Sequence, residues 1–317
     1  MRALVVTSLI LVIVLVSLSA YLRLHHSGIG CTPWPDCYGN IGIVGEAPTA
    51  ADAYERLLEE ASEPLSWATP LHRLVAGVLS LAIVAMNLIA LQRRKDRVIS
   101  SFLLALTIFL AWLGIYSEGL HSPAVVMGNL SGGFAMLGVL GWTVVRKQRG
   151  STNGGSKCRL WTVAALLALC LQILVGGLTS ANFAASACQT LPDCHGTWLP
   201  DASLATAFDL SRVHDVSESG MVVGGPERAA IHKLHRLTAV LTAIAVLVAG
   251  ACAVTAGNRL RLVGFVVITL LAAEFSLGVA AVLTGLPIVM AVAHNWLAAL
   301  LLLGLVSLLA ESQAGSG

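Results

Sequence analysis

Long apolar segments recur along the whole chain, and they restrict the fold more than any other feature of the sequence. Each spans roughly 20 residues, enough for a helix to cross a hydrocarbon core of about 30 Å. Only a helix satisfies all its backbone hydrogen bonds within one such segment. There are eight, at approximately 3–24, 67–91, 98–117, 123–145, 160–180, 227–255, 262–283 and 287–310. Since only 11% of residues are charged, the sequence predicts an all-α membrane protein with eight transmembrane helices.

The first segment has a competing interpretation as a cleaved signal peptide. Only Arg2 precedes it, its apolar run is long, and no clear small-x-small cleavage motif follows it. It also matches the fifth segment in an internal repeat of the sequence. We therefore expect it to remain as a membrane-spanning helix.

Lysine and arginine are distributed unevenly between the two sets of connecting segments. Arg2 and the connections at 93–97, 146–159 and 259–261 hold 12 of the 19 basic residues. Because cytoplasmic loops are enriched in Lys and Arg, both termini are expected in the cytoplasm, with the protein in the inner (plasma) membrane of the cell. The net charge of +2 reflects this topology and does not indicate nucleic-acid binding.

The connecting segments also divide the chain. Two long ones, 25–66 and 181–226, are expected outside the membrane, the first with a short surface helix near 52–62. The Gly/Ser-rich stretch 150–157 is typical of a flexible linker. We predict an N-terminal four-helix half at 1–149, a cytoplasmic linker at 150–159 and a C-terminal four-helix half at 160–317.

The two halves repeat the same motifs in the same order. The pattern C-x3-P-D-C-x-G occurs at 31–39 and again at 188–196. The second and sixth segments each open with a His-Arg pair, and the two pairs are 163 residues apart. Two further positions in each half also match. The matched positions are His72 with His235, Arg73 with Arg236, Gly114 with Gly278, and Asn129 with His294. This pattern predicts a duplication, with two four-helix bundles related by a pseudo-two-fold axis along the membrane normal.

Histidines inside the apolar segments are candidate site residues, because a buried imidazole is costly unless it has a partner. His235 and His294 are predicted at similar depths, roughly 8–12 Å into the membrane. Two imidazoles from facing helices can bind a haem iron axially, and nearby alanines leave room for a flat macrocycle. Plain hydrogen bonding between helices is the alternative. His232, one turn before His235, is a rival ligand. We prefer His235, because His72 occupies the equivalent position in the first half of the repeat.

Several other polar residues in the segments have more than one interpretation. Arg73 and Arg236 either pair with haem propionates or extend to lipid headgroups. Glu274 is either a proton-handling group or a carboxyl group bonded to a neighbouring helix. Gln172 precedes Gly176 by four residues, as Glu274 precedes Gly278, and we expect it to pack. The remaining histidines are interpreted as surface residues: His25, His26, His121, His195 and His214.

Each long outer segment contains one pair of cysteines, and disulfides are stable outside the cytoplasm. We predict a disulfide within each pair, Cys31–Cys37 and Cys188–Cys194. Metal binding is less favoured because nothing nearby completes a tetrahedral set, whereas a redox role stays open. The other cysteines are expected to be free thiols: Cys158, Cys170 and Cys252.

The motifs together resemble those of the heme A synthase family of cytochrome oxidase assembly proteins. The resemblance covers nearly the whole chain. It rests on SGIGCTPWPDCYG (27–39), LHRLVAG (71–77), QILVGGLTSANFAASACQTLPDCHGTW (172–198), IHKLHRL (231–237) and LPIVMAVAHNWLAALLL (286–302). The resemblance implies an oxidoreductase acting on a CH group, which oxidises a methyl group of heme O to the formyl group of heme A by successive hydroxylations.

The resemblance also implies roles for individual residues. His235 and His294 match the ligands of a low-spin heme b that relays electrons. His72 matches a substrate-side histidine in the half that holds heme O, and Cys31 and Cys37 match a pair implicated in catalysis or haem handling. The implied partners are heme O, a heme O synthase and a membrane electron donor within the lipid bilayer; a homo-oligomer is left open.

The N-terminal half departs from the family pattern at two positions. Asn129 stands where the family has a second substrate-side histidine, and Thr69 stands where it has a glutamate. An amide is a poor iron ligand, and threonine cannot do the acid–base work of a carboxylate. These departures leave a second hypothesis open, a non-catalytic b-type haem protein for electron transfer or haem carriage.

Overall fold

The structure is a computed structural model that describes residues 1–26, 38, 67–116, 122–146, 156–200, 204–211, 214, 217 and 222–313. Eight of its helices are long and apolar enough to cross a membrane. They are α1 (Arg2–His26), α3 (Ala68–Arg93), α4 (Arg97–Tyr116), α5 (Pro123–Val145), α6 (Ser156–Ala181), α8 (Pro226–Ala256), α9 (Asn258–Leu283) and α10 (Ile288–Gln313). The predicted all-α membrane fold is confirmed. A short helix, α7 (Leu204–Ala207), lies in the outer segment before α8.

Local sequence explains where several of these helices begin and end. Pro123 and Pro226 occupy the first positions of α5 and α8, where a missing backbone N–H costs nothing. Arg94 ends α3 in a left-handed conformation, and its backbone N–H caps carbonyls of the last turn. Gly257 alone joins α8 to α9 with a φ of 80°, a conformation that glycine adopts readily.

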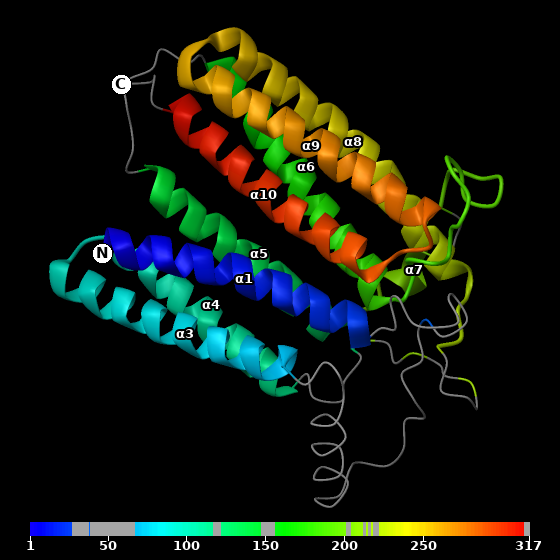
Figure 1. Ribbon diagram of the computed structural model, residues 1–317, viewed down its shortest axis with the longest axis horizontal. Coiled ribbons are helices and arrows are strands. Elements are labelled where there is room, and N and C mark those ends of the chain that lie inside the picture. The colour runs from blue at the N-terminus through cyan, green and yellow to red at the C-terminus, as the bar shows by residue number, and fades with distance from the viewer. Residues whose placement is uncertain are drawn as a thin grey trace, which may run out of the picture.

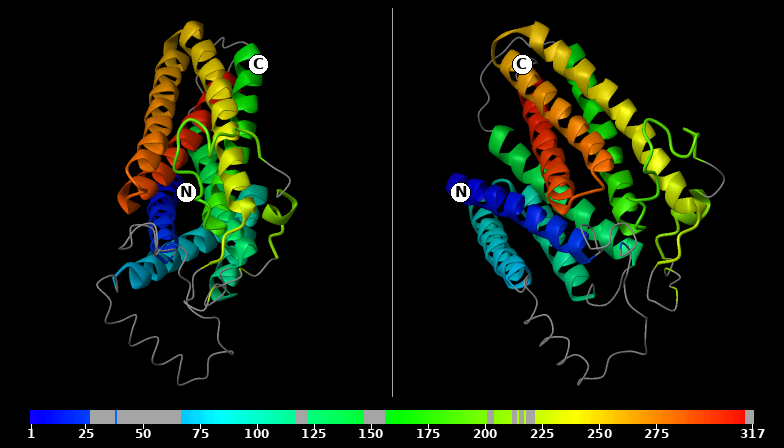
Figure 2. Two further views of the ribbon diagram at one scale, coloured as in Figure 1. Left: turned by 90° about the vertical axis from the view of Figure 1, so that its right-hand side faces the viewer. Right: turned by 45° about the vertical axis from the view of Figure 1, so that its right-hand side comes forward.

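The eight helices form two groups of four with the same neighbour relations (Figures 1 and 2). In the first group α1 packs against α3, α3 against α4, α4 against α5, and α5 against α1. In the second group α6 packs against α8, α8 against α9, α9 against α10, and α10 against α6. The second and fourth helices of each group therefore face each other diagonally, as two copies of one bundle would.

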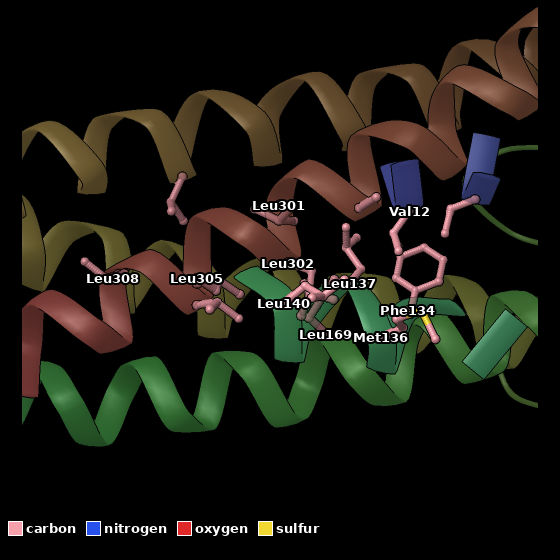
Figure 3. Packing of buried hydrophobic residues seen from close by; sticks show 14 of the residues in the cluster. Val12, Phe134, Met136, Leu137, Leu140, Leu169, Leu301, Leu302, Leu305 and Leu308 are labelled. Carbon is pink, nitrogen blue, oxygen red and sulfur yellow. The ribbon is translucent and has the colours of Figure 1, made fainter. Parts of the chain in front are cut away.

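An apolar core joins the two groups. Helix α5 contacts α6 and α10, and α1 also contacts α10. Leu137 and Leu140 of α5 are fully buried there together with Leu301 and Leu305 of α10 (Figure 3). Leucines that face away from both groups are exposed, such as Leu81 at 73%, as expected for helices that lie in lipid.

Helices α8 and α9 approach each other closely because both carry glycine at the contact. A Cβ atom on Gly264 would lie 2.8 Å from the carbonyl oxygen of Gly250 and 2.9 Å from the Cβ atom of Ala253. Small residues allow such close packing between membrane helices. The single-residue turn at Gly257 between the helices requires the same proximity.

The structure corrects the prediction that Cys158 and Cys252 are free. They form a disulfide that joins the first turn of α6 to the last turns of α8. Each residue lies near the end of its own helix, and the two helices pack along their length, so the thiols meet although 94 residues separate them. Cys170 is a free thiol, as predicted.

Several predicted features lie outside the described residues. They are the Cys31–Cys37 pair, the short surface helix near 52–62, most of the linker at 150–159, and the surface exposure of His26 and His121.

Candidate haem site

His235 lies in α8, about two and a half turns after its first residue, and faces α6. The side-chain amide nitrogen of Gln172 in α6 lies 3.2 Å from Nδ1 of His235 and 3.2 Å from its backbone carbonyl oxygen. Thr238 donates a hydrogen bond to the other end of the same amide. Gln172 was expected only to pack, whereas the structure places it as the polar partner of this imidazole.

His294 lies in α10 and has a different polar partner. Its Nδ1 atom is 3.3 Å from Oε1 of Glu274 in α9. The Glu274 side chain is 14% exposed, and that of His294 is 33% exposed. Of the two interpretations of Glu274, the structure therefore bears out contact with a neighbouring helix.

A glycine faces each of these two imidazoles. A Cβ atom on Gly176 would lie 3.2 Å from Cε1 of His235, and one on Gly278 would lie 3.0 Å from Cε1 of His294. Both glycines lie one helical turn beyond the polar partner, at Gln172 + 4 and Glu274 + 4. The same short pattern thus supplies a polar contact and a space for the ring.

The two imidazoles belong to the same group of helices. They come from α8 and α10, which lie diagonally across this group, and each lies beside a polar side chain of a neighbouring helix. Two histidines on facing helices are the residue types that bind a haem iron axially in helical bundles. These residues therefore fit a haem at this position.

His232, the rival ligand, contacts the outer segment. It is buried, and its Nδ1 atom lies 3.0 Å from the carbonyl oxygen of Ala184. His214 makes a similar contact with the carbonyl oxygen of Ala181 at 3.0 Å and is only 7% exposed. The interpretation of His214 as a surface residue was wrong, because the outer segment folds back over the helix ends and covers it. His195 is exposed, as predicted.

Arg236 follows His235 directly and holds the outer cysteine loop. Cys188 and Cys194 are joined by a disulfide. The guanidinium of Arg236 donates hydrogen bonds to the carbonyl oxygens of Cys188, Thr190 and Asp193 at 2.6–2.7 Å. This contact was not among the interpretations of Arg236 drawn from the sequence. It couples the loop to the helix turn that carries His235.

Tyr38 connects the first cysteine motif to the second group of helices. Its ring lies 6.0 Å from that of Phe183, and both belong to a buried cluster against Ile288 and Ala291 of α10. Burial raises the pKa of Tyr38 to about 12, although Arg228 lies near enough to oppose the shift. Tyr38 therefore packs against α10 about one helical turn before His294.

In the first group, the diagonal helices α3 and α5 carry His72 and Asn129 at the matching positions. Thr69 lies one turn before His72, on the same face of α3. A Cβ atom on Gly114, the counterpart of Gly278, would meet no atom of the described residues within 4 Å. The first group thus has one imidazole at these matched positions, where the second group has two. Arg73 is exposed at the adjoining position.

Eight membrane helices in two groups, with two histidines on diagonal helices of one group, define a multi-pass membrane protein with residues suited to holding a cofactor between helices. A sequence profile of the cytochrome oxidase assembly protein family matches residues 2–306. The chain belongs to this family.

Curated relatives agree with the family match. The chain is 31% identical over 308 residues to heme A synthase of Shewanella oneidensis, covering 95% of this chain and 93% of the relative. It is 28% identical to heme A synthase of Rhizorhabdus wittichii, covering 94% and 89%. It is 24% identical to heme A synthase of a Caulobacter species, covering 92% and 90%. These similarities extend along both four-helix groups.

Proposed function

We propose that this protein is a heme A synthase, an oxidoreductase that converts the methyl group of heme O to the formyl group of heme A for cytochrome oxidase assembly. The observation that carries the proposal is the pair of histidines on diagonal helices, each beside a polar side chain, in a chain that matches heme A synthases over nearly its whole length. The same length of match favours a synthase over a non-catalytic haem protein.

In this proposal His235 and His294 hold a heme b in the second group of helices. When bound, that haem would supply one-electron transfer. Gln172 and Glu274 lie beside Nδ1 of the two imidazoles at 3.2 and 3.3 Å, and Gly176 and Gly278 give the rings their space. Arg236 holds the outer loop over this end of the site, and both it and Arg73 remain candidates for contact with propionates.

The first group of helices would hold heme O, with His72 as the substrate-side histidine. Asn129 cannot provide a second axial imidazole, so substrate binding in this group would rest on a single histidine. Cys31 and Cys37 are assigned by resemblance to catalysis or haem handling, as a disulfide-forming pair.

The proposal includes the surroundings of the protein. We place it in the plasma membrane with both termini in the cytoplasm, on the basis of the distribution of Lys and Arg. The two functional halves are 1–149 and 160–317, joined by the linker at 150–159. The expected partners are a heme O synthase and a membrane electron donor.

The proposal is tested by co-expressing the chain with a heme O synthase and separating the extracted haems by chromatography. Heme A, or a hydroxylated intermediate, is expected to appear only when this chain is present. The matched control is the His72→Ala variant, which should leave heme O unconverted while retaining heme b. Accumulation of heme O alone with the wild-type chain would refute synthase activity.

A further inference from the structure

We propose that Glu274 is a positioning residue that makes His294 a more electron-rich haem ligand than His235, so that the two axial ligands of the haem differ. This inference rests on the haem proposed for His235 and His294. It concerns the redox behaviour of that haem, which the synthase assignment by itself leaves undetermined.

The first observation is the geometry of the Glu274 carboxyl group. Oε1 lies 3.3 Å from Nδ1 of His294, across the contact between α9 and α10. Oε2 is buried and has no hydrogen-bond partner among the residues that the structure describes. Nδ1 of His294 likewise has no hydrogen-bond partner of suitable geometry among these residues, so the two groups form a close pair at 3.3 Å that a small side-chain rotation would turn into a hydrogen bond.

The second observation is that the ring of His294 has little freedom to turn away. On its Cε1 side the backbone of Gly278 approaches so closely that even a methyl group there would be 3.0 Å away. With Gly278 against Cε1 and Glu274 at Nδ1, the Nε2 atom is the one left to meet a metal. A carboxyl oxygen at Nδ1 also fixes the tautomer that Nε2 ligation requires, with the proton on Nδ1.

The third observation is the contrast with His235, whose partner is an amide. Gln172 lies 3.2 Å from Nδ1 of His235 and is itself held by Thr238 and by the His235 carbonyl oxygen. The amide nitrogen of Gln172 is a hydrogen-bond donor, and its oxygen accepts from Thr238, whereas a carboxyl oxygen can accept a hydrogen bond from the imidazole. The positions of Gln172 and Glu274 are alike, four residues before a glycine, yet their chemistry differs.

An acceptor at Nδ1 makes a histidine a more electron-rich ligand, because it draws the Nδ1 proton away from the ring. An electron-rich ligand stabilises ferric iron more than ferrous iron, and second-shell hydrogen bonding is one of the protein's means of tuning haem potential. Glu274 therefore lowers the reduction potential of the haem, which favours electron transfer out of this site. Gln172 does not act in this way, because the atom that it presents to Nδ1 of His235 is the amide nitrogen, a donor that cannot accept the Nδ1 proton.

The test measures the midpoint potential of the haem in purified full-length protein by spectroscopic titration, together with the ferric electron paramagnetic resonance spectrum. Glu274→Leu is expected to raise the midpoint potential and shift the low-spin signal. Glu274→Gln, which keeps the shape and an oxygen acceptor, should raise the midpoint potential less than Glu274→Leu does. Glu274→Asp, which keeps the carboxyl group, should have a potential between those of Glu274→Leu and the wild type. Gln172→Leu is the matched control and should change the potential less than Glu274→Leu.

The inference is overturned if Glu274→Gln and Glu274→Leu both keep the wild-type potential and spectrum, or if Gln172→Leu shifts them more. A different failure would concern the proposed haem itself. If the wild-type protein carries no haem, or if His294→Ala retains an unchanged spectrum, the ligand assignment fails before Glu274 is tested. Haem content measured in the same samples separates the two results.

Discussion

Replacing Gly278 by alanine tests whether the glycine exists to make room for the haem ligand. In an ordinary helix interior, glycine to alanine is favourable by about 1 kcal/mol, because alanine has the higher helix propensity. At Gly278 the new Cβ atom would lie 3.0 Å from Cε1 of His294. Carbon atoms in contact prefer about 3.5–4.0 Å, so the ring would have to retreat by roughly half an ångström or more.

Retreat is difficult for a ring that is bound to iron at one nitrogen and held by Glu274 at the other. Overpacking of this kind costs about 1–3 kcal/mol. If that cost falls on the bound state, haem affinity should decrease by roughly 5- to 150-fold. The assay is the haem dissociation constant of purified Gly278→Ala, with thermal unfolding of the haem-free protein measured alongside.

Gly114→Ala is the matched control, since Gly114 is the repeat counterpart of Gly278 and lies in the other group of helices, where its Cβ atom would meet no described atom within 4 Å. It should leave haem affinity unchanged. The reasoning is refuted if Gly278→Ala binds haem as tightly as the wild type, or if both variants lose affinity equally.

Three further predictions follow from contacts elsewhere in the structure. Gly264→Leu should lower the thermal unfolding temperature, because its side chain cannot fit against Gly250 and overpacking costs about 1–3 kcal/mol; an unchanged melting curve would contradict this contact. Arg236→Ala should make the loop at 188–194 more sensitive to protease, because three hydrogen bonds to its carbonyl oxygens are lost. Equal cleavage rates in the variant and the wild type would show that these hydrogen bonds do not stabilise the loop. Cys158 and Cys252 should resist a maleimide in denaturant until reductant is added, and labelling without reductant would show that they are not bonded.

The sequence predicted the helices well because lipid leaves few alternatives. A segment of about 20 apolar residues has to form a helix, and Pro123 and Pro226 mark two of the starts. Proximity between separate helices was harder to predict. Cys158 and Cys252 lie 94 residues apart, and only the packing of α6 on α8 brings them together.

The histidines of the candidate site could be selected from the sequence, but their polar neighbours could not. His235 and His294 stood out because an imidazole is rare inside an apolar segment. Gln172 was expected only to pack, since the sequence alone does not show which helix faces which. The signal was present in the shared spacing of Gln172 to Gly176 and Glu274 to Gly278. The contacts of Arg236 and His214 depend on the folded outer segment, which no periodicity describes.

The central claim is that His235 and His294 together hold one haem in the second group of helices. It is tested most directly by the absorption spectrum and haem-to-protein ratio of the purified chain and of its His235→Ala, His294→Ala and His232→Ala variants. A low-spin b-type spectrum is expected in the wild type and in His232→Ala, and it should be lost or become high-spin in the other two. An unchanged low-spin spectrum in either His235→Ala or His294→Ala would contradict the claim.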